Sequence, residues 1–379
     1  MTRLDPNERV AVLVTAIGGG GHGEQILKAL RAAPETNYRI VGADASGDCP
    51  QFEMVDHALT LPKASDHNYI DAVLEVCRAF GVLAVFHGCE PELRAMSEAR
   101  DRFADAGLFL PINPSSVIEL CMDKRRTAEF LKGNGFAPPR FTEISDAESL
   151  AKIDWFPVVL KPVLGGGGSR DCFIAQNPRE LEILTEYLGT ANERFLVQEY
   201  VGDYTSEYTV GVLHDMDGKF INSIALKRIM SSALNYRTVV RNLSGRPELG
   251  EWLIISSGVS HGTVAAFPEV TEPCERIAGA LGCRGAVNIQ CRLVDGEVRV
   301  FEINPRFSGT TSIRAMLGYN EPDVLIRRHL MGEDIEPRFA YSEGTVFRSL
   351  LESFVPESGV PSWEKAIAEH PTLEREQRQ

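Results

Sequence analysis

The sequence contains no run of about 18 apolar residues, the length that a membrane-spanning helix requires. It is also poor in positive charge, because 39 lysines and arginines face 53 aspartates and glutamates, for a formal net charge of -14. That balance argues against a general binder of nucleic acid or of anionic membranes, although it allows a local basic pocket for phosphates. The first nine residues lack the apolar stretch of a secretory signal, so we expect a short polar leader.

Cysteine is present, but its eight positions form no CxxC pair and no recognisable set of zinc ligands. Several cysteines, such as Cys77, Cys172 and Cys291, stand in apolar segments, where the thiol behaves as a small hydrophobic group. We therefore expect reduced thiols in a cytoplasmic protein. With 44% hydrophobic and 24% charged residues, the composition is that of a globular protein. Its 379 residues predict two or three domains.

The first part of the sequence alternates apolar runs with helical patterns, which is typical of an open α/β layer. Residues 9–15 form a continuous apolar run, as expected for a central parallel strand. Further strands are predicted over 38–44 and 82–87, and helices over 24–32, 69–80 and 92–106. We expect this layer to end near residue 111.

A glycine-rich turn follows the first strand. Gly18, Gly20 and Gly23 fit the spacing G-x-G-x-x-G, and Asp44 stands where the ribose-binding acid of a dinucleotide site would stand. The same residues are also explained by a turn that lets strand and helix approach closely, because so many glycines match several patterns by chance. Both interpretations, NAD binding and a close turn, stay open at this point.

The rest of the sequence indicates a second segment from residue 113 and a third, mostly antiparallel, from about residue 197. Ser116 and Glu119 have the spacing of a capping box, and Asp123 is expected to cap the helix after it. In the second segment we predict a helix over 124–132, strands over 157–162, 171–175 and 195–201, and a helix over 178–188. In the third we predict strands over 207–213, 219–226, 285–294 and 298–303, and helices over 268–281 and 321–331.

The most informative stretch is the end of the strand over 298–303. Glu302 lies on that strand, Asn304 and Pro305 stop it, and Arg306 follows directly. Glu302 and Asn304 are two residues apart and therefore share a face. Hard oxygen ligands beside a fixed cation suit a Mg²⁺-bound polyphosphate. The plain alternative is an edge strand that ends in a polar turn.

The register of the last hairpin bears on the same site. A three-residue loop at Asp295-Gly296-Glu297 would place Gln290 opposite Glu302, whereas a two-residue loop would place Ile289 there. We prefer the three-residue loop because Gln290 belongs to the polar alternation of its strand.

A second glycine run, residues 165–168, differs from the first in its neighbours. Lys161 ends a buried strand before it, and Ser169 and Arg170 follow it. Free N–H groups between two cations suit a phosphate chain, although the spacing is not that of a Walker A motif. A simple hairpin turn with basic flanks is the alternative. Glu199 and Glu207 interrupt apolar strands, and each alone could lie on the solvated face of its strand.

The order of these pieces resembles the ATP-grasp superfamily, most closely single-module relatives of the carbamoyl-phosphate synthetase large chain, over about residues 10–332. The resemblance implies a Rossmann-like α/β pre-ATP-grasp domain followed by a two-subdomain α+β ATP-grasp fold. The expected parts are residues 1–112 for the first domain, 113–196 for the small subdomain with a glycine lid, 197–335 for the core subdomain, and 336–379 for a C-terminal extension.

The resemblance also implies roles for single residues. Lys124 and Lys161 would hold the nucleotide phosphates, and Arg306 would stabilise the transferred phosphoryl group, with Arg306 and Lys161 as catalytic residues. Glu302 and Asn304 would ligate the metal, with the amide Gln290 where the family often has a second acid. The expected lid residues are Gly165, Gly166, Gly167, Gly168 and Ser169. Glu199 and Val201 would lie at the adenine and Glu207 at the ribose, and the further expected nucleotide contacts are Gln198, Tyr200 and Gln290.

The implied activity is that of an ATP- and Mg²⁺-dependent (or Mn²⁺-dependent) ligase. It would activate a carboxylate as an acyl phosphate for attack by an amine or thiol. Carboxyphosphate or carbamoyl-phosphate chemistry and a non-catalytic ATP sensor are the alternatives. The expected partners are a small-molecule carboxylate and an amine, with no nucleic acid or membrane, and a homodimer is a further expectation. Candidate substrate contacts are Lys227, Arg228, Arg237, Arg241 and His261.

Overall fold

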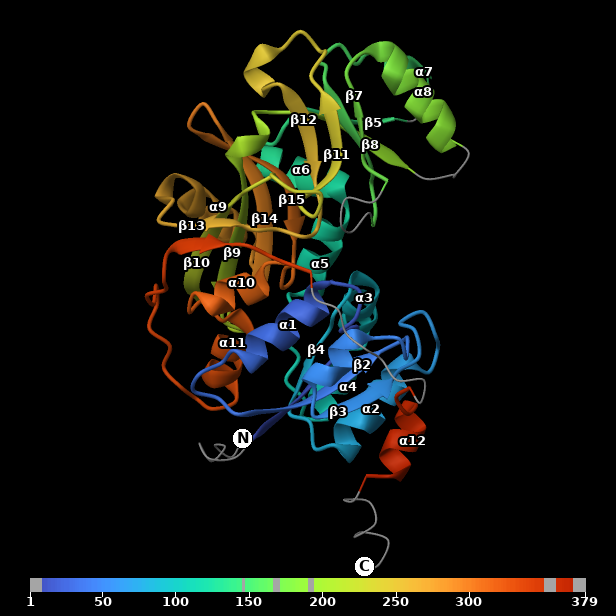
Figure 1. The fold of residues 1–379 in the computed structure, drawn as a ribbon, viewed down its shortest axis with the longest axis vertical. Coiled ribbons are helices and arrows are strands. Elements are labelled where there is room, and N and C mark those ends of the chain that lie inside the picture. The colour runs from blue at the N-terminus through green and yellow to red at the C-terminus, as the bar shows by residue number, and fades with distance from the viewer. Residues whose placement is uncertain (1–8, 145–146, 166–170, 190–193, 351–358, 371–379) are drawn as a thin grey trace, which may run out of the picture.

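The computed structural model describes residues 9–144, 147–165, 171–189, 194–350 and 359–370. Figure 1 shows three parts stacked along the long axis of the molecule: an α/β layer at one end, a large sheet in the middle and a small sheet at the other end. Within those residues no helix is long and apolar enough to cross a membrane.

The α/β layer is a parallel sheet in the order β3-β2-β1-β4. Its central strand β1 is buried throughout, as the unbroken apolar run predicts. The predicted helix over 92–106 is instead two helices that meet at Ala99. The strand β3 was not predicted. The elements are β1 (Val10–Val14), α1 (His22–Arg31), β2 (Tyr38–Asp44), β3 (His57–Thr60), α2 (Tyr69–Ala79), β4 (Ala84–Phe86), α3 (Glu90–Glu98) and α4 (Arg100–Asp105).

The first glycine turn brings α1 close to the sheet. A Cβ atom on Gly23 would lie 2.3 Å from the carbonyl oxygen of Ala16, so a larger residue there would push the helix away. The carboxylate of Asp44 accepts hydrogen bonds from the N–H groups of Gly18 (2.8 Å) and Ser46 (3.0 Å). The glycines and Asp44 therefore hold this turn together, which supports the close-turn interpretation.

The small sheet is antiparallel, in the order β5-β8-β6-β7. Asp123 caps α6 as predicted, by accepting a hydrogen bond from the N–H of Arg126 at 2.9 Å. The capping box is wrong, because α5 begins at Ser115 after Pro114 and leaves Ser116 inside the helix. This part contains α5 (Ser115–Met122), α6 (Lys124–Gly133), β5 (Phe141–Ile144), α7 (Ala147–Ala151), β6 (Val158–Pro162), β7 (Phe173–Ala175), α8 (Pro178–Gly189) and β8 (Phe195–Glu199).

The large sheet has the order β15-β14-β9-β10-β13-β16. Residues on one face pack with α9, and those on the other share a core with α10, α11 and the α/β layer. Strands β11 and β12 form a separate ribbon beside the small sheet (Figure 1). The strands are β9 (Glu207–His214), β10 (Phe220–Arg228), β11 (Tyr236–Arg241), β12 (Trp252–Ser256), β13 (Gly262–Val264), β14 (Gly285–Val294), β15 (Glu297–Asn304) and β16 (Gly344–Val346). The helices are α9 (Pro268–Leu281), α10 (Thr311–Met316) and α11 (Glu321–His329).

The end of the described chain returns to the α/β layer. The short helix α12 (Trp363–Ala368) lies beside α2 in Figure 1 and packs Trp363 and Ile367 on that layer's core. The N–H of Thr60 donates to the carbonyl of Pro361 at 3.0 Å, which ties the segment to β3.

The hairpin between β14 and β15 corrects one prediction and confirms another. Val294 pairs with Glu297, so the loop has two residues rather than three, and Asp295 and Gly296 both have the positive φ that such a turn requires. An irregularity between Gln290 and Cys291 then shifts the register by one residue. As a result Gln290 faces Glu302, as predicted, although for a different reason.

Candidate functional site

A cavity lies between the small sheet and the large sheet, and the structure brings most of the predicted site residues to it. Its wall includes apolar residues, among them Pro139, Val159, Ile254 and Ile255. The predicted site residues on the same wall are Lys124, Lys161, Gln198, Glu199, Tyr200, Val201, Glu207, Gln290 and Glu302. An adjoining hollow is lined by Gly165, Asn304 and Arg306 together with Lys124 and Glu302.

Lys161 is buried at the junction of the two sheets. Its Nζ donates to Oε1 of Gln198 at 2.7 Å and to the carbonyl of Phe301 at 2.9 Å. Burial lowers the pKa of Lys161 to about 8, although the nearby carboxylate of Glu302 opposes that change. A buried ammonium group with two neutral partners gains from an anionic ligand, because the anion compensates the charge that burial disfavours.

The polar residues of the large sheet stand in rows across its strands. Residues two apart on a strand share a face, so Glu207, Thr209 and Gly211 of β9 lie on the same face of the sheet. In the ladders, Glu207 lies opposite Arg292, Thr209 opposite Gln290 and Gly211 opposite Asn288, while Gln290 faces Glu302 and Asn288 faces Asn304. Because of this pairing, the polar residues around Gln290 and Glu302 form one polar surface.

The predicted metal residues meet at the end of β15. Gln290 donates from Nε2 to Oε2 of Glu302 at 2.8 Å, and Arg306 donates from Nη2 to Oδ1 of Asn304 at 3.0 Å. In the described part of the chain, no group of three or more His, Cys, Asp or Glu side chains could hold a metal. One carboxylate and two amides are still a suitable set for Mg²⁺, which usually takes few protein ligands and completes its shell with phosphates and water.

Arg306 has a partner that the sequence did not reveal. Its Nη2 lies 3.0 Å from Oε1 of Glu90, at the start of α3 in the α/β layer. Burial opposes ionisation of Glu90, but Arg306 outweighs it and lowers the pKa of this carboxyl. The imidazoles of His22 and His87 lie nearby, with Nε2 of His22 3.2 Å from Nδ1 of His87. Burial lowers the pKa of both rings and the charge of Arg306 lowers it further, in His87 to about 3. The α/β layer therefore helps to position the arginine.

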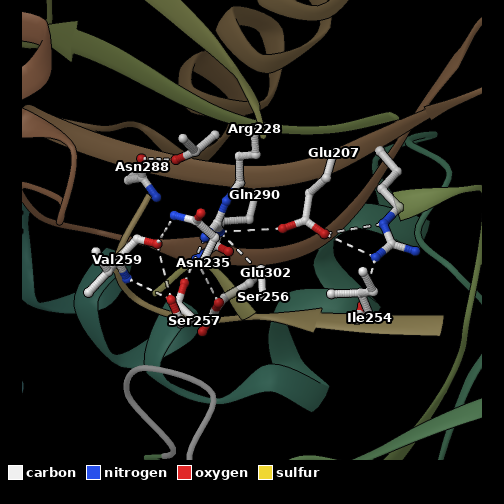
Figure 2. A network of polar contacts seen from close by, with 12 residues as sticks. Glu207, Arg228, Asn235, Ile254, Ser256, Ser257, Val259, Asn288, Gln290 and Glu302 are labelled. Carbon is white, nitrogen blue, oxygen red and sulfur yellow. Dashed lines mark hydrogen bonds and ion pairs between the residues drawn. The ribbon is translucent and has the colours of Figure 1, made fainter. Parts of the chain in front are cut away.

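Glu207 lies between two arginines. Its Oε2 accepts from Nε and Nη2 of Arg292, at 3.2 and 3.0 Å, and its Oε1 lies 3.3 Å from Nη1 of Arg228 (Figure 2). All three residues are buried. Within the described residues Oε1 has no hydrogen-bond partner, although Glu207 lines the cavity. That oxygen is suited to accept a hydroxyl hydrogen, as the predicted ribose role requires.

The predicted adenine segment lies on the wall of the cavity. Glu199 pairs with Arg246 at 3.3 Å, and the N–H of Tyr200 donates to Pro157. The Tyr200 ring is a structural element, since its hydroxyl exchanges hydrogen bonds with the backbone of Ile254. Gln198 accepts a hydrogen bond from Lys161, and the carbonyl oxygen of Val201 accepts one from Nη1 of Arg292 at 3.1 Å.

The second glycine run is only partly described. Lys124 donates from Nζ to the carbonyl of Gly165, which brings this predicted phosphate ligand to the start of the run. Gly166, Gly167, Gly168 and Ser169 lie outside the described residues.

The candidate substrate contacts divide into two groups. Lys227, Arg237 and Arg241 are exposed. Arg228 and His261 are buried, and Arg228 lines a cleft next to the metal residues. All five were predicted with equal weight, because their burial depends on a sheet that only the folded chain reveals.

Comparison with known proteins agrees with this arrangement. Residues 12–110 match the family described as "PylC-like, N-terminal domain", and residues 256–347 match "ATP-grasp in the biosynthetic pathway with Ter operon". The chain is 25% identical over 355 residues to the carbamoyl phosphate synthase large chain of Thermotoga sp. (strain RQ2). The match covers 84% of this chain but only 29% of that protein.

Two solved structures have the same fold. The biotin carboxylase of Campylobacter jejuni, in a complex with βγ-ATP, superimposes with a TM-score of 0.63 at 16% identity, covering 89% of this chain and 74% of that one. The L-amino acid ligase of Bacillus licheniformis gives 0.59 at 18% identity, covering 88% and 78%.

Proposed function

Since this chain is an ATP-grasp protein resembling carbamoyl-phosphate synthase large chains, we propose that it uses ATP to activate a small carboxylate as an acyl phosphate, which an amine then attacks. The observation that carries the proposal is the meeting of Lys161, Glu302 and Arg306 beside one cavity, from elements far apart in the sequence. A biotin carboxylase with bound βγ-ATP and an amino acid ligase share the fold, which supports this class of chemistry.

The cavity suits a nucleotide. The apolar side chains of Val159 and Ile254 would contact a flat base, and the segment Glu199–Val201 would contact the edge of that base. Oε1 of Glu207 would accept a ribose hydroxyl, while Lys161 and Lys124 would hold the phosphates. Because Lys161 is buried, its charge acts on the phosphates with little screening by water.

Glu302, Asn304 and Gln290 would hold Mg²⁺ together with the phosphates. When bound, the metal would neutralise charge on the β- and γ-phosphates. Arg306, fixed between Glu90 and Asn304, would face the transferred group with its guanidinium already oriented. Such preorganised charges act where negative charge develops in the transition state.

The reaction would proceed in two balanced steps. A carboxylate oxygen attacks the γ-phosphorus, the bond to the β–γ bridging oxygen breaks, and ADP departs with that electron pair. The amine nitrogen then attacks the carbonyl carbon of the acyl phosphate. The bond between that carbon and the phosphate oxygen breaks, inorganic phosphate leaves, and the nitrogen releases a proton to phosphate or solvent. A thiol would follow the same course.

The direct test is ADP release by the purified protein with ATP, Mg²⁺ and a panel of carboxylic acids, bicarbonate included, each with and without an amine. We expect ADP release that depends on one acid. Glu302→Gln should lose about 100-fold or more of that rate, as removal of a charge-stabilising group typically does. Glu251→Gln, at an exposed carboxylate outside the cavity, should retain it. If neither ATP binding nor acid-dependent ADP release occurs, the proposal is wrong.

We also propose that the protein acts on small molecules in the cytoplasm. A homodimer stays a prediction, which light scattering on the purified protein would test.

A further inference from the structure

A second cleft opens beside Gln290 and Glu302. Every residue on its wall is polar, charged or glycine, among them Arg228, Ser257, Gly258, Asn288, Arg306 and Gly309. Because this cleft shares Glu302, Asn304 and Arg306 with the metal end of the site, it is where the carboxylate to be activated would lie.

The amide of Asn288 has a fixed orientation. Its Oδ1 accepts from Nη2 of Arg314 at 2.6 Å and from Oγ1 of Thr209 at 2.8 Å. Arginine can only donate, so the oxygen of this amide must face Arg314. Glu321 holds Arg314 in place at 3.0 Å, and Gly211 leaves room for it, since a Cβ there would lie 2.4 Å from Nη1. The NH₂ group of Asn288 therefore points away from Arg314, toward the loop that carries Ser257 (Figure 2).

Two guanidinium groups add donors to the same wall. Arg228 is buried, and its Nη1 and Nη2 donate to Oγ of Ser256 (3.0 Å) and to the carbonyl of Ser257 (2.7 Å). Its Nε has no hydrogen-bond partner in the described residues. Within those ranges, Nε of Arg306 also has no hydrogen-bond partner. A buried N–H without a partner costs free energy, and a ligand oxygen would recover it.

The opposite wall is a short, fixed loop. Ser257 donates from its N–H to Asn235 at 2.9 Å, and its Oγ donates to Val259 at 3.0 Å. A Cβ on Gly309 would lie 2.8 Å from the carbonyl oxygen of Gly258, so the two loops touch and close the cleft at that end. A ligand here is small.

We propose that the activated substrate is a small carboxylic acid with a second oxygen-bearing group that accepts hydrogen bonds, such as a second carboxylate or a hydroxyl. The reacting carboxylate lies toward Arg306 and Glu302, and the second group meets the NH₂ of Asn288 and the guanidinium of Arg228. This inference rests on the proposed function and specifies its substrate class.

The lining also decides against other acids. An apolar chain would strip water from Asn288, Arg228 and the hydroxyl groups without replacing those hydrogen bonds. An ammonium group at the same place would face the N–H donors of Asn288 and Arg228, to which it can donate no hydrogen bond.

Acids of matched length test the proposal. ADP release is measured with succinate, butyrate and 4-aminobutyrate, with malate and glycolate as hydroxy acids and with bicarbonate alone, each with ammonium as the amine. We expect succinate or one of the hydroxy acids to stimulate ADP release at least tenfold more than butyrate or 4-aminobutyrate. Equal or greater stimulation by butyrate, 4-aminobutyrate or bicarbonate would overturn this inference and leave the proposed function standing. No stimulation by any of these acids would overturn this inference, and the loss of ATP binding as well would overturn the proposed function.

Asn288→Asp gives a second, nearly isosteric test. The new carboxylate keeps the acceptor for Arg314 but replaces the NH₂ donor with a negative charge. The KM for the preferred acid should rise roughly 10- to 150-fold, the loss expected for a hydrogen bond to a charged group, while the KM for ATP changes less than twofold. Asn134→Asp, the same change at an exposed residue, is the control. An unchanged KM for the acid in Asn288→Asp would contradict the assignment.

Discussion

The pH dependence of ATP binding should reveal the loss of the positive charge of Lys161. Burial lowers the pKa of its ammonium group to about 8, so the free protein loses this charge as the pH rises through that value. Bound phosphates favour the charged form and raise the pKa in the complex. If only the charged form binds well, affinity follows its fraction, which is about nine-tenths at pH 7 and about one-tenth at pH 9. The dissociation constant for Mg²⁺–ATP should therefore rise about tenfold, or about 1.4 kcal/mol, between these pH values.

Isothermal titration calorimetry from pH 7 to pH 9 at constant ionic strength measures this change directly. The variant Lys161→Met, which carries no titrating group there, should bind ATP more weakly at pH 7 and show little further change up to pH 9. Lys124→Met is the matched control, because it removes a phosphate ligand but leaves Lys161 to titrate. Its affinity should still fall with rising pH. A dissociation constant of the unchanged protein that stays constant from pH 7 to pH 9 would refute the role given to Lys161.

Three further predictions concern the structure around the site. Glu207→Gln should lower the free energy of unfolding by about 3–5 kcal/mol in urea titration, because it leaves Arg228 and Arg292 buried without their carboxylate. Gly23→Ala should lower it by about 1–3 kcal/mol, since the new methyl group meets Ala16, whereas Gly47→Ala, in open space, should not. Burial raises the thiol pKa of Cys77, Cys121 and Cys283 above that of the unfolded chain. Their contribution to stability is fully present below the unfolded pKa of about 8.5 and is lost above it, by up to about 1.4 kcal/mol per thiol and pH unit, so the urea midpoint should fall between pH 8.5 and 10.

The sequence predicted the parts of the site that lie on strongly patterned strands. Glu302 and Asn304 end an apolar strand, and Lys161 ends another, so their place near strand ends follows from local pattern alone. The pairing of Gln290 with Glu302 was also predicted, but the loop was wrong. A two-residue turn at Asp295-Gly296 and a register shift further along the strands compensate each other, and no local rule fixes where such a shift occurs.

The partners of these residues could not be predicted, because they come from distant parts of the chain. Glu90 stands 216 residues before Arg306, and its ion pair depends on how the α/β layer packs against the large sheet. Arg292 appeared only as one polar residue of an alternating strand, yet it meets Glu207 because β14 and β9 are neighbours. The ribbon of β11 and β12 was missed. Residues of β11 alternate between half-buried and exposed, whereas the short apolar run of β12 is buried and was not recognised as a strand.

The central claim is that a carboxylate oxygen attacks the γ-phosphorus of ATP. The most direct measurement uses the preferred acid with both carboxylate oxygens labelled as ¹⁸O and follows the label in the released phosphate by mass spectrometry or ³¹P NMR. Attack by the carboxylate predicts one ¹⁸O atom in each molecule of inorganic phosphate formed with the amide, and none in phosphate formed by Glu302→Gln, whose rate should be near background. Phosphate that contains no ¹⁸O while amide still forms would contradict the account.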